Sequence, residues 1–253
     1  MENKFKVGIS LFFCLFYGVY HVAAADQTEN TNITFDLEEE DEDFFEEEGE
    51  VVISDPLKWF NKPMYHFNDK LYSWFLRPTC KAYQKVIPNI ARGRVRDFFS
   101  NLKSPLRIVS NGLQGDLKQS ARETGRFIIN STIGLGGLFD PAGRRFKISK
   151  KIEDFGQVFG KWNIRSGPYL HLPFYGPSNL RDSVGSVFDG FFLASNYFFP
   201  HNIEGVIGVR GLQLVDNTTA LMNQIDGLKR DAIDPYSYSR DAWLQFREQQ
   251  VKD

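Results

Sequence analysis

Residues 55–78 read DPLKWFNKPMYHFNDKLYSWFLRP, a stretch rich in aromatic side chains. Its large apolar residues recur at spacings of three and four: Phe60, Met64, Phe67, Leu71, Trp74 and Phe75. This spacing places them on one face of a helix, with polar residues between them. A stripe with so many large rings either fills a protein core or lies in a lipid interface, and the rest of the sequence has to decide between the two.

The same stretch marks where helices begin and bend. Asp55 followed by Pro56 is typical of a helix start, because Asp caps the first turn and proline lacks an N–H that this turn does not use. Pro63 predicts a kink, followed by a second helical segment that ends at Leu76. Further helices are expected at residues 80–86, 89–103, 117–130 and 203–228, and from Ser104-Pro105, Gly176-Pro177-Ser178 and Asp234-Pro235 onward.

Residues 154–176 interrupt this helical pattern. Pro168 and Pro173 exclude a continuous helix, and four glycines accompany them, so we expect an irregular, extended segment. Alternation of apolar and polar residues is nearly absent from the chain, and no Asn-Gly turn joins two apolar runs. The fold class that the sequence predicts is therefore all-α.

Charge divides the 253-residue chain into three parts, although the net charge is only −2. Residues 1–25 carry +1, residues 26–50 carry −13 and the remainder carries +10. We interpret residues 1–25 as a signal peptide cleaved after Ala25, with an uncleaved membrane anchor as the alternative. Residues 26–52 are expected to be an acidic disordered tail, which could also fold back on the basic part. Residues 53–253 are expected to form a single helical domain.

Cysteine use narrows the possible chemistry. Cys14 follows two phenylalanines in the apolar run, a poor context for acylation, and Cys80 is the cysteine that remains after cleavage. One cysteine excludes an intrachain disulfide and a multi-cysteine metal site. We interpret Cys80 as a free thiol on a helix.

The constellations of common enzymes are missing from the sequence. There is no HExxH and no GxSxG motif, and His66, His171 and His201 lack metal-ligand spacing. The glycine-rich residues 134–143 have no preceding strand and no Walker lysine, so we interpret them as a flexible turn. We expect no catalytic residue, no metal and no cofactor. Export argues against nucleic acid as a partner. A membrane-interface protein and an ordinary soluble domain with a Phe-rich core remain as alternatives.

A series of motifs follows in order between residues 53 and 192. They are DPL (55–57), FNKPMY (60–65), FN (67–68), RP (77–78), VIP (86–88), FFSNL (98–102), LQG (113–115), RF (126–127), NST (130–132), GLGG (134–137), DFG (154–156), GPY (167–169), LP (172–173), GP (176–177) and RD (181–182). In this order they resemble the MlaA (VacJ) family of outer-membrane lipid-asymmetry proteins. The last sixty residues match that family more loosely.

This resemblance implies a ring of mostly amphipathic helices that lies in the membrane plane around a polar channel. The ring is expected in the periplasmic leaflet of the outer membrane. There it would remove misplaced phospholipid from the outer leaflet and pass it to a periplasmic lipid-carrier protein, in association with a trimeric porin. The alternatives are a porin-associated envelope protein that moves no lipid and, more weakly, a lipid-degrading enzyme with an unrecognised site.

Roles of single residues follow from motif position in the family. The resemblance implies that Phe67 and Asn68 control the channel. The gating loop comprises Gly134, Gly136, Gly137, Asp140 and Gly143. The channel wall comprises Gly167, Pro168, Tyr169 and Pro173. The candidates for headgroup binding, chosen on charge and motif position, are Arg92, Arg126 and Arg181.

One feature departs from the family, whose members are typically lipid-anchored through a cysteine at the signal cleavage site. Cleavage after Ala25 leaves no cysteine there. Membrane retention would then depend on the apolar belt of the helices and on the porin.

Overall fold

The computed structural model describes residues 54–193 and 203–252. Helices dominate this part of the chain, together with a two-stranded sheet. In chain order the elements are α3 (Lys58–Leu71), the π-helix η2 (Tyr72–Leu76), α4 (Arg77–Val86), α5 (Asn89–Leu102), α6 (Ser104–Leu113), α7 (Leu117–Thr132), α8 (Pro141–Arg144), α9 (Phe155–Lys161), β1 (Tyr169–Leu172), β2 (Gly176–Asn179), α10 (Leu180–Phe192), α12 (Ile203–Asp231) and α13 (Pro235–Lys252). The expected signal peptide and acidic tail lie outside the described residues.

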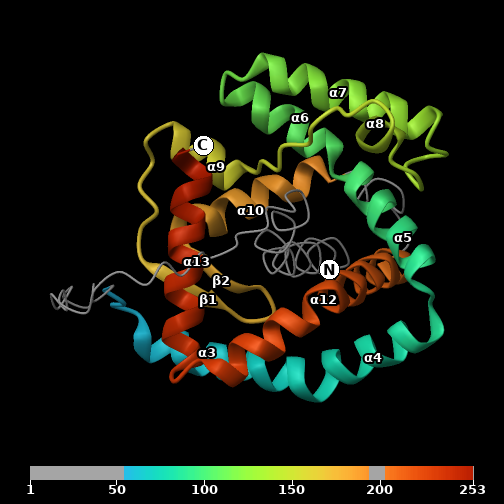
Figure 1. Ribbon diagram of the computed structural model, residues 1–253. Coiled ribbons are helices and arrows are strands. Elements are labelled where there is room, and N and C mark those ends of the chain that lie inside the picture. The colour runs from blue at the N-terminus through green and yellow to red at the C-terminus, as the bar shows by residue number, and fades with distance from the viewer. Residues whose placement is uncertain (1–53, 194–202, 253) are drawn as a thin grey trace, which may run out of the picture.

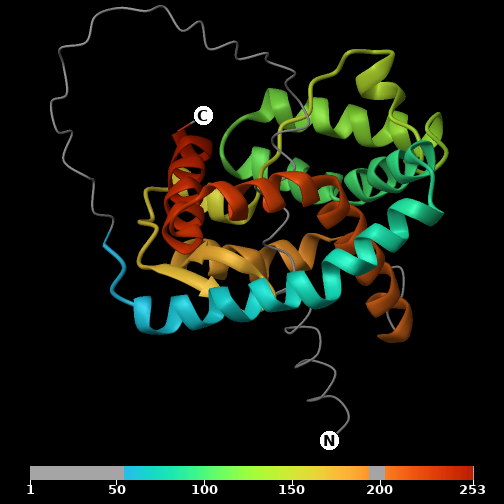
Figure 2. The ribbon, with the colours of Figure 1, turned by 60° about the horizontal axis from the view of Figure 1, so that its bottom comes forward.

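The elements follow one another around the outside of the molecule (Figure 1). The run α3–η2–α4 forms one side, and α5 leads from it to the packed pair α6 and α7 on the opposite side. A third side is formed by α9 and α13, which contact each other. Figure 2 shows α3, η2 and α4 as one continuous helical run. On the inner side, α12 packs along α4 and α5, and α10 packs on α9.

The kink predicted at Pro63 is wrong, because Pro63 lies inside the uninterrupted helix α3. Because proline has no backbone N–H, the helix lacks one hydrogen bond at this position. Tertiary contacts offset this loss: the Asn61 amide nitrogen donates to Tyr169 O (3.0 Å), and Asn61 Oδ1 accepts the N–H of His171 (2.8 Å). These buried bonds hold the first half of α3 against β1, so the helix continues through the proline.

The π-helical turn η2 divides the aromatic stripe between two sides. The wider turn directs Tyr72 into the molecule, where its hydroxyl donates to Asp226 Oδ1 at 2.8 Å. Tyr72 also shares an apolar cluster with Met222 of α12. Trp74 and Phe75 point the other way and are 79% and 62% exposed. Part of the stripe is therefore core, and the rest is outer surface.

Several other predicted helices are confirmed. The starts of α5, α6, α7, α12 and α13 agree with prediction within one residue. Asp116 caps α7 by accepting the N–H of Gln119 at 2.9 Å. Pro105 and Pro235 lie in the first turns of α6 and α13, where a missing N–H is harmless.

The irregular, extended segment predicted for residues 154–176 is wrong where the helix α9 forms. No continuous helix crosses the region, as predicted, and its extended part includes the strand β1. β1 pairs antiparallel with β2, with Tyr169 opposite Asn179. The turn between them is tight and uses a positive φ of 65° at Phe174. The strands read YLHL and GPSN, and neither alternates clearly between apolar and polar residues, so the strand pattern could not identify them. The all-α prediction is corrected to a helical fold with one small hairpin.

Because of the hairpin, the following helix begins later in the sequence than predicted. The sequence predicts that α10 begins within residues 176–178, but these residues belong to β2. α10 begins at Leu180, and its cap is Asn179, whose side chain accepts the N–H of Asp182 at 2.8 Å. Asn179, as a typical helix-capping residue, is the local signal in the sequence that indicates the correct start of this helix.

Apolar packing is divided among three small clusters, each at a junction of elements. The first lies around Leu106, Phe155 and Tyr175, where α6 and α9 meet the hairpin. The second joins η2 and α4 to α12. The third joins β1 to α13 through Tyr169, Tyr236 and Trp243. Between these junctions the interior is largely polar.

Candidate functional site

Many large apolar side chains lie on the outside of the molecule. Those of the described residues that are exposed on helices or loops are Trp59, Phe67, Trp74, Phe75, Val86, Ile90, Leu113, Leu117, Ile128, Ile133, Leu135, Leu138, Phe139, Phe146, Trp162, Ile164, Leu180, Val184, Phe188, Phe191, Ile207, Leu212, Ile233 and Tyr238. Exposed apolar area on this scale indicates a surface that contacts protein or lipid. Within the described residues, no helix combines the length and hydropathy required to cross a bilayer.

The interior has the opposite character. Among the described residues, buried side chains are more often polar or charged than apolar. They include complete ion pairs, such as Arg107 with Glu123, whose Nε and Oε2 atoms are 2.8 Å apart. A soluble domain normally buries its apolar residues and exposes its charged ones. This chain therefore reverses the usual distribution over much of its fold.

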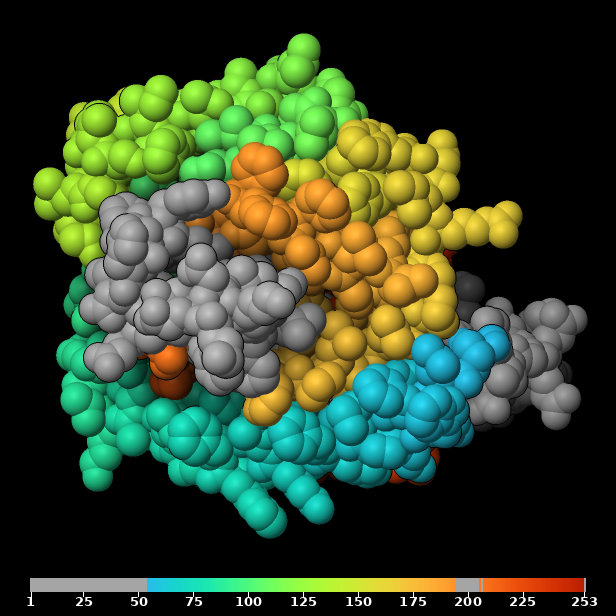
Figure 3. Space-filling view, turned by 180° about the vertical axis from the view of Figure 1, so that it is seen from behind, coloured from blue at the N-terminus to red at the C-terminus, as the bar shows by residue number. Residues whose placement is uncertain are grey.

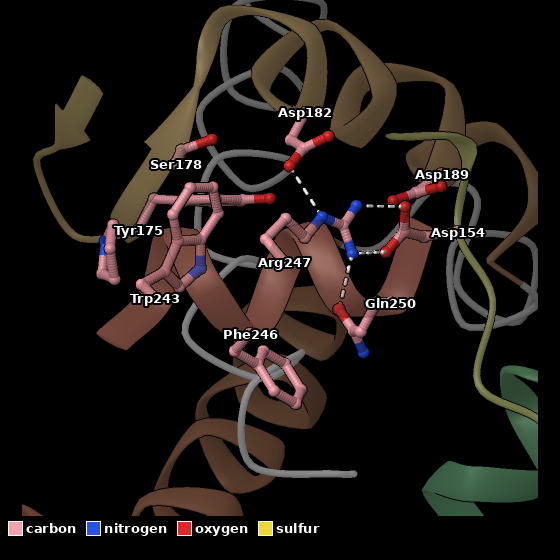
Figure 4. A pocket seen from close by; sticks show the side chains of 10 residues that line it. Asp154, Tyr175, Ser178, Asp182, Asp189, Trp243, Phe246, Arg247 and Gln250 are labelled. Carbon is pink, nitrogen blue, oxygen red and sulfur yellow. Dashed lines mark hydrogen bonds and ion pairs between the residues drawn. The ribbon is translucent and has the colours of Figure 1, made fainter. Parts of the chain in front are cut away.

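The densest buried charge lies where α9, α10 and α13 meet (Figure 4). Arg247 of α13 donates to both carboxylate oxygens of Asp154, at 2.6 and 2.8 Å, and to Asp182 Oδ2 at 2.7 Å. Asp154 also caps α9 by accepting the N–H of Gln157. One guanidinium thus connects three helices that are far apart in the sequence.

A third carboxylate, that of Asp189, lines the same pocket (Figure 4). Its Oδ1 accepts the backbone N–H of Phe155 at 2.9 Å. Burial, and then the charge of Asp154, raise the pKa of Asp189 well above its ordinary value. The pocket therefore holds a carboxyl group that releases its proton less readily than an exposed one, beside an arginine that bonds to two other acids.

The structure brings the predicted channel-control pair to the predicted channel wall. The Asn68 amide nitrogen donates to Leu172 O at 2.8 Å, and Asn68 Oδ1 accepts the N–H of Phe174 at 2.7 Å. The rings of Phe67 and Phe174 meet edge to face at 5.1 Å. Pro173 lies between the two residues that Asn68 holds. The hairpin itself lies between α3 and α10 on the face seen in Figure 3.

Other wall residues lie at the opposite end of the hairpin. Gly167 has φ of 70°, and Pro168 accepts the N–H of Leu180 through its carbonyl oxygen at 3.2 Å. Tyr169 is buried against Trp243, with ring centroids 6.1 Å apart. These residues join the hairpin to α10 and α13.

The predicted gating loop is closely packed at two of its glycines. A side chain at Gly137, where φ is 95°, would lie 2.7 Å from Asn101 Nδ2, and one at Gly134 would clash with the backbone of Asn130. Gly136 has open space around it. Asp140 caps α8 by accepting the N–H of Gly143 at 3.0 Å. The glycines therefore permit close packing of this turn against α5 and α7.

The three headgroup candidates lie on different helices and are not brought together. Arg126 of α7 is buried and pairs with Asp140 at 2.9 Å. Arg181 of α10 is also buried at its side chain and pairs with Asp182 at 2.9 Å. Arg92 of α5 is partly exposed and bonds to Asn89 within its own helix. Arg126 and Arg181 are thus already paired with carboxylates within the protein.

Sequence reasoning missed the buried charges at Arg107, Glu123, Asp154 and Arg247. One signal for them exists in α6, where polar residues recur at spacings of three and four: Ser104, Arg107, Ser110, Asn111 and Gln114. This polar stripe faces α7 and the segment before α9 through the bonds of Arg107 to Glu123 and of Gln114 to Glu153. No local pattern indicates Arg247, whose partners lie 65 and 93 residues away.

Comparison with known proteins gives consistent matches over most of the chain. The family model described as MlaA lipoprotein matches residues 53–250. The intermembrane phospholipid transport system lipoprotein MlaA of Escherichia coli is 36% identical over 195 residues, which cover 76% of each chain. An uncharacterized protein of Rickettsia bellii is 31% identical over 223 residues, 86% of this chain and 87% of that protein. A solved structure described as "Structural basis for maintenance of bacterial outer membrane lipid asymmetry" superposes with a TM-score of 0.69 at 32% identity, covering 79% of this chain and all of the other.

Proposed function

This chain belongs to the MlaA lipoprotein family, and from that premise we propose how its architecture handles phospholipid. The protein acts in intermembrane phospholipid transport and maintains the lipid asymmetry of the outer membrane. It belongs to a family of outer-membrane transport lipoproteins and is not an enzyme. Its substrate is therefore phospholipid, and its chemistry is binding and passage without bond cleavage.

In our proposal, the helices form a ring in the plane of the periplasmic leaflet around a polar channel. One observation carries this proposal: large apolar side chains lie outside and polar or charged side chains lie inside. Acyl chains pack favourably against an apolar exterior, but they cannot form hydrogen bonds with polar groups of the backbone or side chains. Water and phospholipid headgroups, in contrast, are stabilised by a polar interior. Residues 53–253 would act as the single domain that forms this ring.

We assign control of the channel to the contact between Phe67-Asn68 and the tip of the hairpin. Two hydrogen bonds and one ring contact hold this tip to α3. The positive φ of Phe174 shows that the tip adopts a conformation that a non-glycine residue rarely takes. Loss of the Asn68 bonds would therefore let the tip move, and the channel wall would change shape with it. The loop Gly134–Gly143 is the second element that we propose to respond to lipid.

Two protein partners complete the proposal. A trimeric porin would contact part of the apolar exterior, and a periplasmic lipid-carrier protein would receive phospholipid from the channel. The exported chain would be retained in the outer membrane by its apolar belt and by the porin. We propose both partners on the basis of the family resemblance.

Deletion of the gene followed by measurement of outer-leaflet phospholipid tests the proposed function. We expect outer-leaflet phospholipid to rise in the deletion strain and to return to normal when the gene is restored. Normal asymmetry in the deletion strain would refute lipid transport and would favour a porin-associated structural protein. Purified protein incubated with phospholipid should release no fatty acid.

A further inference from the structure

The short helix α8 is followed by an exposed turn that carries two cations and an aromatic ring. α8 packs on α7, and the chain continues from it as Arg145, Phe146 and Lys147 (Figure 1). The N–H groups of Arg145 and Phe146 donate to Pro141 O at 2.9 and 3.1 Å. Lys147 has a φ of 54°, in the left-handed region that a lysine rarely adopts. The backbone of this turn is therefore bonded to α8, and it presents all three side chains to the outside.

Helix α5 adds a further cation to this surface. Asp97 Oδ2 of α5 lies 2.8 Å from the Arg144 guanidinium and 3.4 Å from that of Arg94. The Arg94 guanidinium also lies 4.4 Å from the centre of the Phe139 ring, in the loop before α8. These contacts join α5, the loop and the end of α8 in one surface. We call it the cationic surface; its residues are Arg94, Phe139, Arg144, Arg145, Phe146 and Lys147.

Positive charge exceeds negative charge on the cationic surface. Asp97 is already shared by two arginines, and Asp140 of the same loop pairs with Arg126 at 2.9 Å. Within the described part of the chain, neither Arg145 nor Lys147 takes part in an ion pair. Cations without acidic neighbours attract an anionic partner.

The apolar side chains of this region indicate what kind of anion fits. Phe139 and Phe146 are 41% and 49% exposed, and Leu138 beside them in sequence is 42% exposed. A bilayer of anionic phospholipid matches both features, because its phosphates lie next to its acyl chains. Arginine and lysine reach the phosphates while the rings enter the boundary of the acyl region. Residues 36–50, with 11 acids, match only the charge by proximity to no described neighbour: α3, from which they would extend, lies on the opposite side of the molecule from α8 (Figure 1).

We propose that the cationic surface binds the headgroups of anionic phospholipids in the leaflet that surrounds the protein. One basic residue close to an anionic membrane strengthens binding by about fivefold. The surface would thus fix this corner of the fold at the level of the phosphates. The inference goes beyond the proposed channel, because it concerns the lipids around the protein and not the lipid that passes through it.

Quenching by brominated lipid, measured at position 146, tests the proposal. The reporter protein is the full chain with Phe146→Trp and with phenylalanine at its four native tryptophans. It would be reconstituted in mixed vesicles of phosphatidylglycerol and phosphatidylcholine in which one lipid or the other is brominated. We expect the reporter to prefer phosphatidylglycerol at least about tenfold at low salt. The preference should fall as salt is added, since the Debye length shortens to about 3 Å at 1 M.

Two variants of the reporter separate the cationic surface from general charge. R145Q/K147Q removes two cations without breaking an ion pair, and the preference should fall by at least about fivefold. K81Q/K85Q removes the same charge from two exposed lysines of α4 and should keep the preference within about twofold. R145K/K147R retains both charges and should behave as the reporter does. Circular dichroism would establish that each variant is folded.

Three results would overturn the inference. One is equal quenching of the reporter by the two brominated lipids. Another is an unchanged preference for phosphatidylglycerol in R145Q/K147Q. The third is weak quenching by both lipids, and if deletion of residues 26–50 then makes quenching strong, the occupant of the surface is the acidic segment of the chain itself. Failure of the proposed function, seen as normal asymmetry in the deletion strain, would leave these quenching results unchanged.

Discussion

Replacement of Arg247 by glutamine tests whether buried charge, rather than a large apolar core, holds the C-terminal helix. The Arg247 side chain is only 6% exposed, and it makes two bonds to Asp154 and one to Asp182. Glutamine cannot reach both acids and carries no charge. The variant therefore leaves Asp154 buried without its counter-charge, whereas Asp182 keeps its pair with Arg181.

The expected loss of stability follows from this geometry. Removal of one partner from a buried ion pair typically destabilises a protein by about 3–5 kcal/mol. A domain is stable by only about 5–15 kcal/mol in total. R247Q should therefore lose a large fraction of its free energy of unfolding, and α13 should separate from α9 and α10 before the rest of the fold is lost.

Urea denaturation in detergent, followed by circular dichroism, measures this loss. The matched control is K252Q, which removes one positive charge from an exposed pair with Glu248 on the same helix. That variant should change stability by less than about 0.5 kcal/mol. The reasoning is refuted if R247Q is destabilised by less than about 1 kcal/mol, because the Arg247 contacts would then contribute no more than a surface pair.

Three further predictions concern the proposed channel and two lysines. Deletion of Phe67-Asn68 should raise outer-leaflet phospholipid above the level of the gene deletion, because it frees the hairpin tip; a variant that fails to accumulate in cells would contradict this. Gly137→Ala should lower the melting temperature, since its Cβ would clash with α5 at a positive φ, whereas Gly93→Ala has open space and should not. Burial lowers the pKa of Lys103 to about 7 and that of Lys150 to about 8, so the protein should become more stable as the pH rises from about 7 to about 10. The lowered pKa values of Lys103 and Lys150 mean that the unfolded chain binds more protons in that range. Equal melting temperatures across that range would contradict the lowered pKa values of the two lysines.

The helix starts could be predicted because their signals are local. Asp116, Ser104-Pro105 and Asp234-Pro235 each mark a first turn through a cap or a proline, and the structure has helices there. Pro63 misled the prediction because its effect is offset by Asn61, which bonds to Tyr169 and His171 more than one hundred residues away. Local rules cannot detect such a contact.

In the candidate site, too, some features could be predicted from the sequence and others could not. Asn68 was found through motif position, and its contact with the hairpin gives that position a structural role. The pairs Arg107–Glu123 and Arg247–Asp154 were missed, because a charged residue in a sequence is normally interpreted as exposed. Burial of these charges is expected only in a protein with apolar side chains outside and charged side chains inside. That arrangement is visible in the exposed fraction of each side chain but not in the amino-acid composition.

Fluorescence quenching by brominated acyl chains tests the inverted arrangement most directly. The chain has four tryptophans, of which Trp59 and Trp74 are 76% and 79% exposed while Trp243 is 6% exposed. Variants that keep one of these three tryptophans, with the others replaced by phenylalanine, would be reconstituted in vesicles of brominated phosphatidylcholine. We predict strong quenching of Trp59 and Trp74 and weak quenching of Trp243. Weak quenching at Trp59 and Trp74, or equal quenching at all three, would contradict a ring with an apolar exterior and a polar interior.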